Sequence, residues 1–246
     1  ADNNTSSEII FPLIADAISS QSYGNTTYIV NGSMGSSTMT TSLFGNPGGN
    51  DAWTGHRATK AWYGLFGNSA AALASSTDAR AQLFWTTGHS YEMTDYKTWA
   101  NGYPSIKFRN TNFTGSSVTT VFSSTDFPLY RLADAYLMYA ECAVRGASGT
   151  SLAQALTYVN DVRTRSGATA LIAGDAGVPF AVNAPASLQV ILDERGRDLN
   201  LEGHRRSDLI RFGKFTGGSY LWPWKGGSAT GTSISSNYNL FPIPST

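Results

Sequence analysis

Residues 194–211 read Glu-Arg-Gly-Arg-Asp-Leu-Asn-Leu-Glu-Gly-His-Arg-Arg-Ser-Asp-Leu-Ile-Arg, and this stretch decides the fold. Nine of these 18 residues are charged, in a chain in which only 14% of all residues are charged. Glu194, Asp198 and Glu202 recur every four residues, which places three carboxylates on one stripe of a helix, where they repel one another. The arrangement is stable only if cations face it, and arginine suits such bidentate pairing.

The charged stretch allows two interpretations. Its acids could form an acid/base pair or a metal site, or they could form a partly buried salt-bridge network that joins helices. We favour the network, because every acid has a cation within one helical turn and neutralised carboxylates are poor catalysts and poor ligands. We expect no metal site, and the predicted network consists of Arg131, Glu141, Arg163, Arg165, Glu194, Arg195, Asp198, Glu202, Arg205, Asp208 and Arg211.

Residues 127–214 are predicted to be mostly helical. Apolar residues recur at helical spacing over 129–144 and again from Thr150 or Ser151 to Arg165. A glycine-containing turn at 146–149 joins the two into an antiparallel hairpin of tetratricopeptide size. A third helix is expected from an N-cap at Ser187 to Glu202, with Gly203 breaking it before 205–212.

Residues 1–125 are rich in Gly, Ser, Thr and Asn and are predicted to be loop-rich. We expect a buried strand at 8–14, a short strand at 28–30, a short helix at 57–66, and extended segments at 79–85 and 106–108. The fold class is therefore mainly α, with irregular loops and a few short strands. We expect one compact unit, part of a longer protein, with a ligand-side region over 1–126 and a helical region over 127–246.

Composition excludes several classes of function. The chain of 246 residues carries 17 basic and 17 acidic residues, so nothing attracts it to nucleic acid. The single cysteine, Cys142, excludes an internal disulfide framework and a cysteine-based zinc cluster. No apolar run is long enough to span a membrane, and the first residues show no signal peptide.

Four segments, in order and spacing, resemble the motifs of the SusD/RagB family. They are the helix from Phe127 to Glu141 (with Arg-Leu-Ala-Asp at 131–134), the helix 155–167 (with Asn-Asp-Val-Arg-Thr-Arg at 160–165), the charged stretch from Leu192 to Arg211, and the closing Pro-Ile-Pro at 242–244. The chain departs from the family in having Asp198 where glutamate is commoner, and in being about half the usual length.

The resemblance implies a SusD-like fold and a surface-exposed, lipid-anchored protein of the cell outer membrane. Such a protein binds an oligosaccharide or polysaccharide (in some members a peptide) and passes it to a SusC-like TonB-dependent outer-membrane transporter. The family is not enzymatic, and the resemblance implies no cofactor. Contact with the membrane would come only through an N-terminal lipid anchor that is absent from this chain.

Aromatic residues in polar loops are the candidate ligand-binding residues, because sugars present flat apolar faces on which rings stack. Four rings within 13 residues form the densest group, beside Asn101; the second group is Trp53, Trp62, Tyr63 and Trp85, and the third is Tyr220, Trp222 and Trp224. Core packing is the competing explanation for each ring. Trp53 is expected to be structural, since it falls on a family motif. The predicted ligand-binding residues are Tyr91, Tyr96, Trp99, Asn101, Tyr103, Trp85 and Trp62.

Enzymatic motifs are absent from the sequence. Its three histidines are isolated, and neither H-E-x-x-H nor G-x-S-x-G occurs. A glycoside hydrolase would need two unpaired carboxylates across a cleft, and only the loop acids Asp51, Glu92 and Asp95 could supply them. Glycan binding without chemistry is therefore the first hypothesis. The alternatives are a surface scaffold or adhesin that binds protein or peptide and, less favoured, a glycoside hydrolase.

Overall fold

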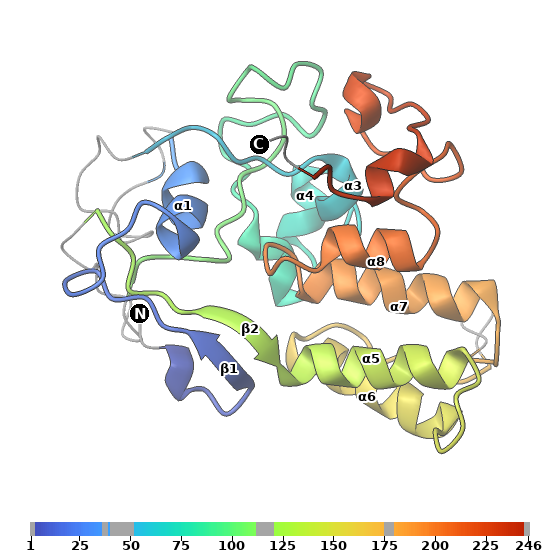
Figure 1. The fold of residues 1–246 in the computed structure, drawn as a ribbon. Helices are drawn as coiled ribbons and strands as arrows, with labels where there is room; N and C mark the ends of the chain where they lie inside the picture. The colour runs from blue at the N-terminus through green and yellow to red at the C-terminus, as the bar shows by residue number, and fades with distance from the viewer. Residues whose placement is uncertain (1–2, 36–38, 40–51, 112–120, 175–179, 244–246) are drawn as a thin grey trace.

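The computed structural model describes residues 3–35, 39, 52–111, 121–174 and 180–243. It confirms a mainly helical chain with irregular loops and one small sheet (Figure 1). Its elements in chain order are η1 (Asn3–Thr5), β1 (Ile9–Leu13), α1 (Asn25–Gly32), α3 (Lys60–Tyr63), α4 (Ala70–Ala74), η2 (Ala79–Leu83), β2 (Phe127–Arg131), α5 (Leu132–Val144), α6 (Leu152–Arg165), α7 (Pro185–Asp198), α8 (Arg205–Arg211), η3 (Lys225–Gly227) and η4 (Ser236–Asn239), where η denotes a 3-10 helix.

Helices α5 and α6 form the expected antiparallel hairpin, and α7 packs against it (Figure 1). The side chain of Ser151 caps α6 by accepting a hydrogen bond from the backbone N–H of Gln154. Leu137, Val159 and Ile191, one from each helix, are completely buried in the largest apolar core. This core holds together the three helices that carry most of the charged stretch and of its ion-pair partners.

The third helix differs from its predicted limits. It begins at Pro185, which suits a first helical turn, while Ser187 lies inside the helix and its hydroxyl accepts a hydrogen bond from the Ala181 N–H. It ends at Asp198, and the chain turns through positive φ at Leu201 (58°) and Gly203 (82°) before α8. Glu202 therefore belongs to the turn and does not lie on the helix.

The helix expected over 129–144 begins three residues late, at Leu132, because the preceding five residues pair with β1 as strand β2. The strand predicted near residues 8–14 is present as β1, but the prediction that it is buried is wrong. Ile10, Phe11 and Tyr130 are 61%, 56% and 60% exposed on this two-stranded sheet. The sequence pattern predicted the strand, but it could not show whether another part of the chain packs over that strand.

Three further local predictions in the first half are wrong. Residues 28–30 lie in α1 and not in a strand, and residues 79–83 form η2, whose first turn is capped by the side chain of Asp78. Residues 106–108 belong to no strand of the described chain. The helix predicted over 57–66 is reduced to α3, because the backbone of Ala58 pairs with that of Tyr103. Long-range pairing and side-chain caps overrode local propensity in these segments.

Two smaller apolar cores support the first half. One gathers Val30, Met34 and Phe108 beside α1, and the other gathers Tyr63, Phe84 and Tyr103 beside α3. No helix in the described ranges has the length and apolar character needed to cross a lipid bilayer.

Candidate functional site

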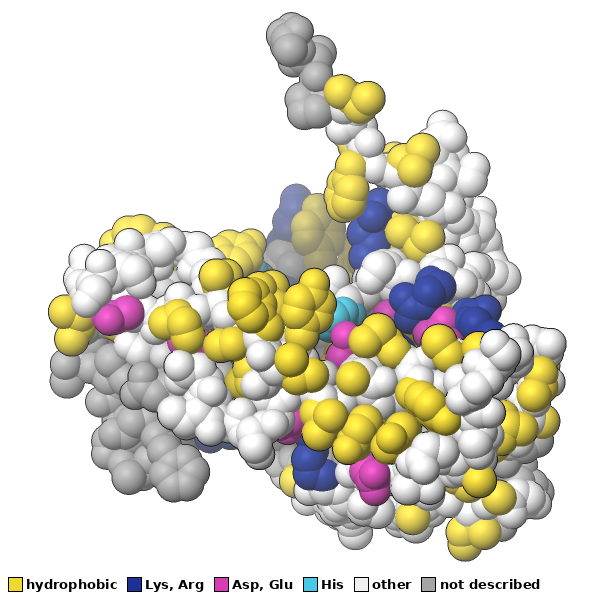
Figure 2. Space-filling model, turned by 60° about the horizontal axis from the view of Figure 1, so that its bottom comes forward, with side chains coloured by type: hydrophobic (Ala, Val, Ile, Leu, Met, Phe, Trp, Pro, Cys, Tyr) yellow, Lys and Arg dark blue, Asp and Glu magenta, His cyan; other side chains and the backbone are white. Residues whose placement is uncertain are grey.

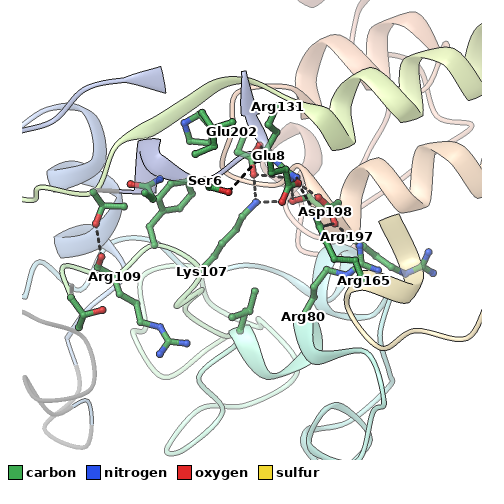
Figure 3. A pocket seen from close by; sticks show the side chains of 17 residues that line it. Ser6, Glu8, Arg80, Lys107, Arg109, Arg131, Arg165, Arg197, Asp198 and Glu202 are labelled. Atoms are coloured by element: carbon green, nitrogen blue, oxygen red, sulfur yellow. Dashed lines mark hydrogen bonds and ion pairs between the residues drawn. The ribbon is translucent and has the colours of Figure 1, made fainter. Parts of the chain in front are cut away.

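The charged stretch lies beside a cavity with a volume of about 550 Å³ (Figure 3). Asp198 is at the centre of the ion-pair network. Its carboxylate forms ion pairs with Arg80 at 2.8 Å, Arg131 at 2.5 Å and Arg165 at 2.6 Å. Glu202 pairs with Arg131 at 2.6 Å and with Lys107. These groups come from η2, the loop that carries Lys107, β2, α6, α7 and the turn after α7, and they meet around Asp198 and Glu202.

Glu194 lies one helical turn before Asp198 and is completely buried. It accepts ion pairs from Arg80 at 2.7 Å, Arg163 at 2.9 Å and Arg197 at 3.1 Å. Three guanidinium groups therefore surround a carboxylate that has no access to solvent. Its contacts are taken up by these guanidinium groups, which leaves no position open for a substrate or a metal.

The second part of the network joins α5, α7 and α8. Arg195 pairs with Asp134 at 2.7 Å and with Asp208 at 2.9 Å. Arg211 pairs with Glu141 at 2.8 Å and with Asp208 at 2.9 Å. Arg205 differs from the prediction, because it donates its hydrogen bond to the Leu192 carbonyl.

Electrostatics support a structural role for these acids. Burial alone would raise the pKa of Asp198, but Arg131, Arg165 and Arg80 outweigh it and lower that pKa below its usual value. In the same way, the partners Arg211 and Arg145 lower the pKa of Glu141 against the effect of burial. Neither carboxyl is poised to exchange a proton near neutral pH. No group of three or more His, Cys, Asp or Glu among the described residues is arranged to hold a metal ion.

Several members of the network could not be identified from the charged stretch alone. Arg80 and Lys107 come from loop-rich segments more than 85 residues earlier in the chain, and they reach Asp198 and Glu202 only in the folded structure. The sequence indicated these partners only indirectly, because three acids on one stripe of a helix require more cations than that helix supplies. The partners that this reasoning did not name are Glu8, Asp78, Arg80, Lys107, Asp134 and Arg145.

The predicted ligand-binding rings separate into buried and exposed ones. Tyr103 is only 1% exposed, which removes it from any binding surface. Trp62 packs against the core that contains Tyr103, while Trp85 and Trp99 pack against the core beside α1. These rings contribute mainly to packing.

The remaining predicted residues lie in one loop. Tyr91 is half-buried, with its hydroxyl donating to the Gly67 carbonyl at 3.1 Å. The side-chain oxygen of Asn101 accepts hydrogen bonds from the backbone N–H groups of Thr94 and Asp95, so this amide holds the loop together. Tyr96 alone of the predicted rings is mostly exposed, at 54%.

A cluster of surface rings beside α1 was not predicted as a site. Tyr23 and Tyr28 are 62% and 54% exposed, and each lies about 6 Å from Trp53, with centroid distances of 6.2 and 6.1 Å. Phe122 supports Tyr23 at 5.0 Å, and His56 meets the ring of Tyr28 edge-on at 4.5 Å. We call Tyr23, Tyr28 and Trp53 the α1 ring platform. The sequence showed two tyrosines five residues apart but could not show that Trp53 lies beside both.

Backbone bonds fix Trp53 against the end of α1. Its N–H donates to the Asn31 carbonyl at 2.9 Å, and the Gly55 N–H donates to the Gly32 carbonyl at 2.9 Å. A side chain at Gly32 would meet the ring of His56 at 2.5 Å, so only glycine permits this approach. The platform is therefore positioned by a helix end and not by loose loops.

The α1 ring platform contains no acidic or basic side chain. Burial lowers the pKa of the adjacent His56, against the effect of a hydrogen bond with the Ile29 backbone. A surface of exposed, neutral rings can bind the apolar face of an uncharged ligand while hydroxyl groups contact its edges.

Comparison with known proteins gives consistent results. Residues 83–245 match the family model described as the SusD family. The starch-binding protein SusD of Bacteroides thetaiotaomicron is 30% identical over 284 aligned positions, covering 99% of this chain and 48% of that protein. The chain thus spans about half the length of the curated relative that it matches.

Solved structures have the same fold. Surface glycan-binding protein A from Bacteroides thetaiotaomicron superposes with a TM-score of 0.61 at 22% identity, over 96% of this chain and 48% of that one. A complex of that protein with laminarihexaose superposes with a TM-score of 0.56 at 23% identity, over 96% of this chain and 49% of that one. At this level of identity the likeness concerns the fold.

Proposed function

Because this chain belongs to the SusD family, we propose that it binds a neutral glycan by stacking sugar rings on the α1 ring platform. The observation that carries the proposal is the exposure of Tyr23 and Tyr28, each of which lies about 6 Å from Trp53. Exposed rings held by the backbone can receive a sugar without first having to become ordered, which lowers the entropic cost of binding.

The proposed activity is binding without catalysis. A glycoside hydrolase needs two available carboxyl groups on opposite sides of the bond that it cleaves. Asp198, Glu194 and Glu202 are all occupied by cations, as described above. Of the loop acids considered from the sequence, Glu92 pairs with Lys60, Asp95 accepts hydrogen bonds within its own loop, and Asp51 lies outside the described residues. The relatives reported above are likewise named as binding proteins.

The wider role that we propose is capture of oligosaccharide at the surface of the outer membrane, for delivery to a SusC-like TonB-dependent transporter. Family membership supports this role, together with the motifs at Arg131–Glu141 and 192–211. The last residue of the closing Pro-Ile-Pro motif, Pro244, lies outside the described residues. Co-purification of the full-length protein with a barrel partner would test this role separately from sugar binding.

The direct test is affinity electrophoresis in gels that contain soluble starch or laminarin, with variants Trp53→Ala and Tyr28→Ala. We expect the wild-type chain to be retarded by a polysaccharide, and each variant to bind it about two- to tenfold more weakly, because a ring contact contributes roughly 0.5–1.5 kcal/mol. Tyr130→Ala removes an equally exposed ring on β2 and serves as the matched control. Unchanged retardation of both platform variants would contradict the proposed site, and release of reducing sugar would favour a hydrolase.

Protein binding is a second candidate function, favoured by the exposed apolar face of the β1–β2 sheet. Hydrophobic side chains gather on the face of the molecule that Figure 2 brings forward. Ile10, Phe11 and Tyr130 of the β1–β2 sheet are each more than half exposed. An isolated two-stranded sheet is marginally stable in water. Size-exclusion chromatography with light scattering distinguishes the cases: concentration-dependent association that Ile10→Ser abolishes would support a protein contact through this face.

A further inference from the structure

A second exposed ring lies away from the α1 ring platform, on the loop 90–101. Tyr96 contacts Trp224 edge-on, with ring centroids 4.9 Å apart and an interplanar angle of 74°. The indole N–H of Trp224 donates to the Met93 carbonyl at 2.9 Å, which ties the C-terminal segment to the loop. Trp224 also holds a φ of 70°, a conformation that costs a non-glycine residue energy and is found where the surrounding structure imposes it.

The loop that presents Tyr96 is internally braced. Asp95 accepts hydrogen bonds from the Lys97 N–H at 2.9 Å and from the Thr98 hydroxyl at 2.8 Å. The Asn101 amide oxygen closes the loop from the other side, at 2.8 Å from the Thr94 N–H. The ring of Tyr96 is therefore exposed on a fixed support, as the rings of the α1 ring platform are.

Arg57 connects this loop to the segment that carries Trp53. Its guanidinium donates to the Gly55 carbonyl at 2.9 Å and to the Tyr96 carbonyl at 2.5 Å. The same group bonds the Thr98 and Asn101 carbonyls at 3.1 Å and lies 5.3 Å from the centroid of the Trp99 ring. Since Gly55 is two residues from Trp53, at most about 7 Å along the backbone, one side chain sets the position of the Tyr96 loop relative to the platform.

Two consecutive residues contact the α1 ring platform and the Tyr96 loop separately. His56 contacts Tyr28 on the α1 ring platform, while the next residue, Arg57, bonds the Tyr96 loop. The α1 ring platform and the Tyr96 loop are therefore contacted by two consecutive residues of one segment.

We propose that Tyr96, supported by Trp224, is a second sugar-binding station for the same neutral glycan, and that Arg57 is the positioning residue that keeps it at a fixed distance from the α1 ring platform. The ligand class that this arrangement selects is an oligosaccharide long enough to reach both stations. The inference rests on the proposed function, because it assigns no separate ligand to Tyr96.

The test is isothermal titration calorimetry on the 246-residue chain with a trisaccharide and a hexasaccharide of the glycan that retards it in gels. Maltotriose and maltohexaose serve for starch, and laminaritriose and laminarihexaose serve for laminarin. The wild type is expected to bind the hexasaccharide more tightly. Tyr96→Ala is expected to weaken hexasaccharide binding about five- to tenfold and to leave the trisaccharide Kd unchanged, because one ring contact is lost.

Arg57→Lys keeps the charge but loses the planar group that bonds several carbonyls at once. We expect it to weaken hexasaccharide binding while trisaccharide binding persists, and Tyr130→Ala to match the wild type at both lengths. A purely structural role for Arg57 would lower the melting temperature and both affinities together, which would overturn its assignment as a positioning residue.

The outcomes separate the two proposals. If the wild type binds glycan and Trp53→Ala abolishes binding, but Tyr96→Ala binds both lengths like the wild type, the second station is refuted and the proposed function stands. If the wild type binds no glycan of either series, the proposed function and this inference are both refuted.

Discussion

Asp198→Asn is the most direct test of the idea that the charged stretch joins the helices together. The substitution keeps the size and shape of a side chain that is 1% exposed, but removes the negative charge that Arg80, Arg131 and Arg165 share. Breaking a buried ion pair by removing one partner costs about 3–5 kcal/mol. Each of the three arginines retains another carboxylate, namely Glu194, Glu202 and Glu8 in turn, so we expect the low end, about 3 kcal/mol.

This loss is large against the roughly 5–15 kcal/mol by which domains are usually stable. Urea unfolding followed by circular dichroism at pH 7 should show it as a lower midpoint with an unchanged slope, and thermal unfolding should show a decrease of about 6–12 °C. Glu92→Gln is the matched control, because the Lys60–Glu92 pair has the same 2.9 Å spacing as several network pairs but lies at the surface. An exposed pair of this kind contributes about 0–1 kcal/mol.

The pH dependence gives an independent criterion. The three arginines hold the pKa of Asp198 below the value of about 3.9 expected in the unfolded chain. The stabilisation is therefore complete above about pH 5 and is lost as the pH falls through the lowered pKa of the folded state. The difference between wild type and Asp198→Asn should shrink in acid. A variant within about 1 kcal/mol of the wild type at pH 7, or a difference that stays constant down to pH 3, would refute the reasoning.

Two further predictions concern the core that supports the Tyr96 loop. Tyr63→Phe should cost about 1–2 kcal/mol in urea unfolding, because the buried hydroxyl donates to the Tyr91 carbonyl, which would be left without that donor. Burial, reinforced by Tyr103 and Tyr91, raises the pKa of Tyr63, and the pKa values of Tyr91 and Tyr103 are raised as well, so absorbance titration of the variant should lack one of the tyrosines that ionise late in the wild type. Gly102→Ala should destabilise the chain by more than about 1 kcal/mol, since φ is 74° and the new methyl group would meet the Ala58 carbonyl at 2.4 Å. Gly88→Ala is the control, because φ there is 77° and the added methyl group has open space, so this variant measures the backbone cost alone. Equal losses of stability in the two variants would contradict the steric explanation.

The helices of the second half were predictable because local signals agreed with the tertiary structure. Leu137 and Ala140 of α5, and Ala155 and Val159 of α6, recur at helical spacing and are all buried. The failures arose where a distant partner decides the conformation. Residues 127–131 became a strand because β1 pairs with them, and no periodicity within that segment reports the partner.

The candidate site was less predictable than the fold. Counting rings in a loop identified Tyr96 but also Tyr103, whose ring is enclosed by Tyr63 and Tyr91 at 4.5 and 6.0 Å. Composition cannot separate an aromatic residue that packs a loop from one that faces solvent, because both occur in the same polar sequence. The platform beside α1 was overlooked for a related reason: Trp53 is 25 or more residues from each of the two tyrosines, and backbone bonds from Trp53 and Gly55 to the end of α1 bring it beside them.

The charged network and the exposed rings are linked through the distribution of charge. A chain with few charged residues concentrates many of them in one buried network, where Asp198, Glu194 and Glu202 neutralise arginines from both halves of the sequence. The cations that complete it include Arg80 and Lys107, which belong to the loop-rich first half. Because an unpaired buried charge is costly, these loops must be in place when α7 packs, so the network anchors the segments that lead to the Tyr96 loop. Much of the chain's charge is thereby used inside the fold, and the α1 ring platform consists of aromatic side chains, as the proposed binding of a neutral glycan requires.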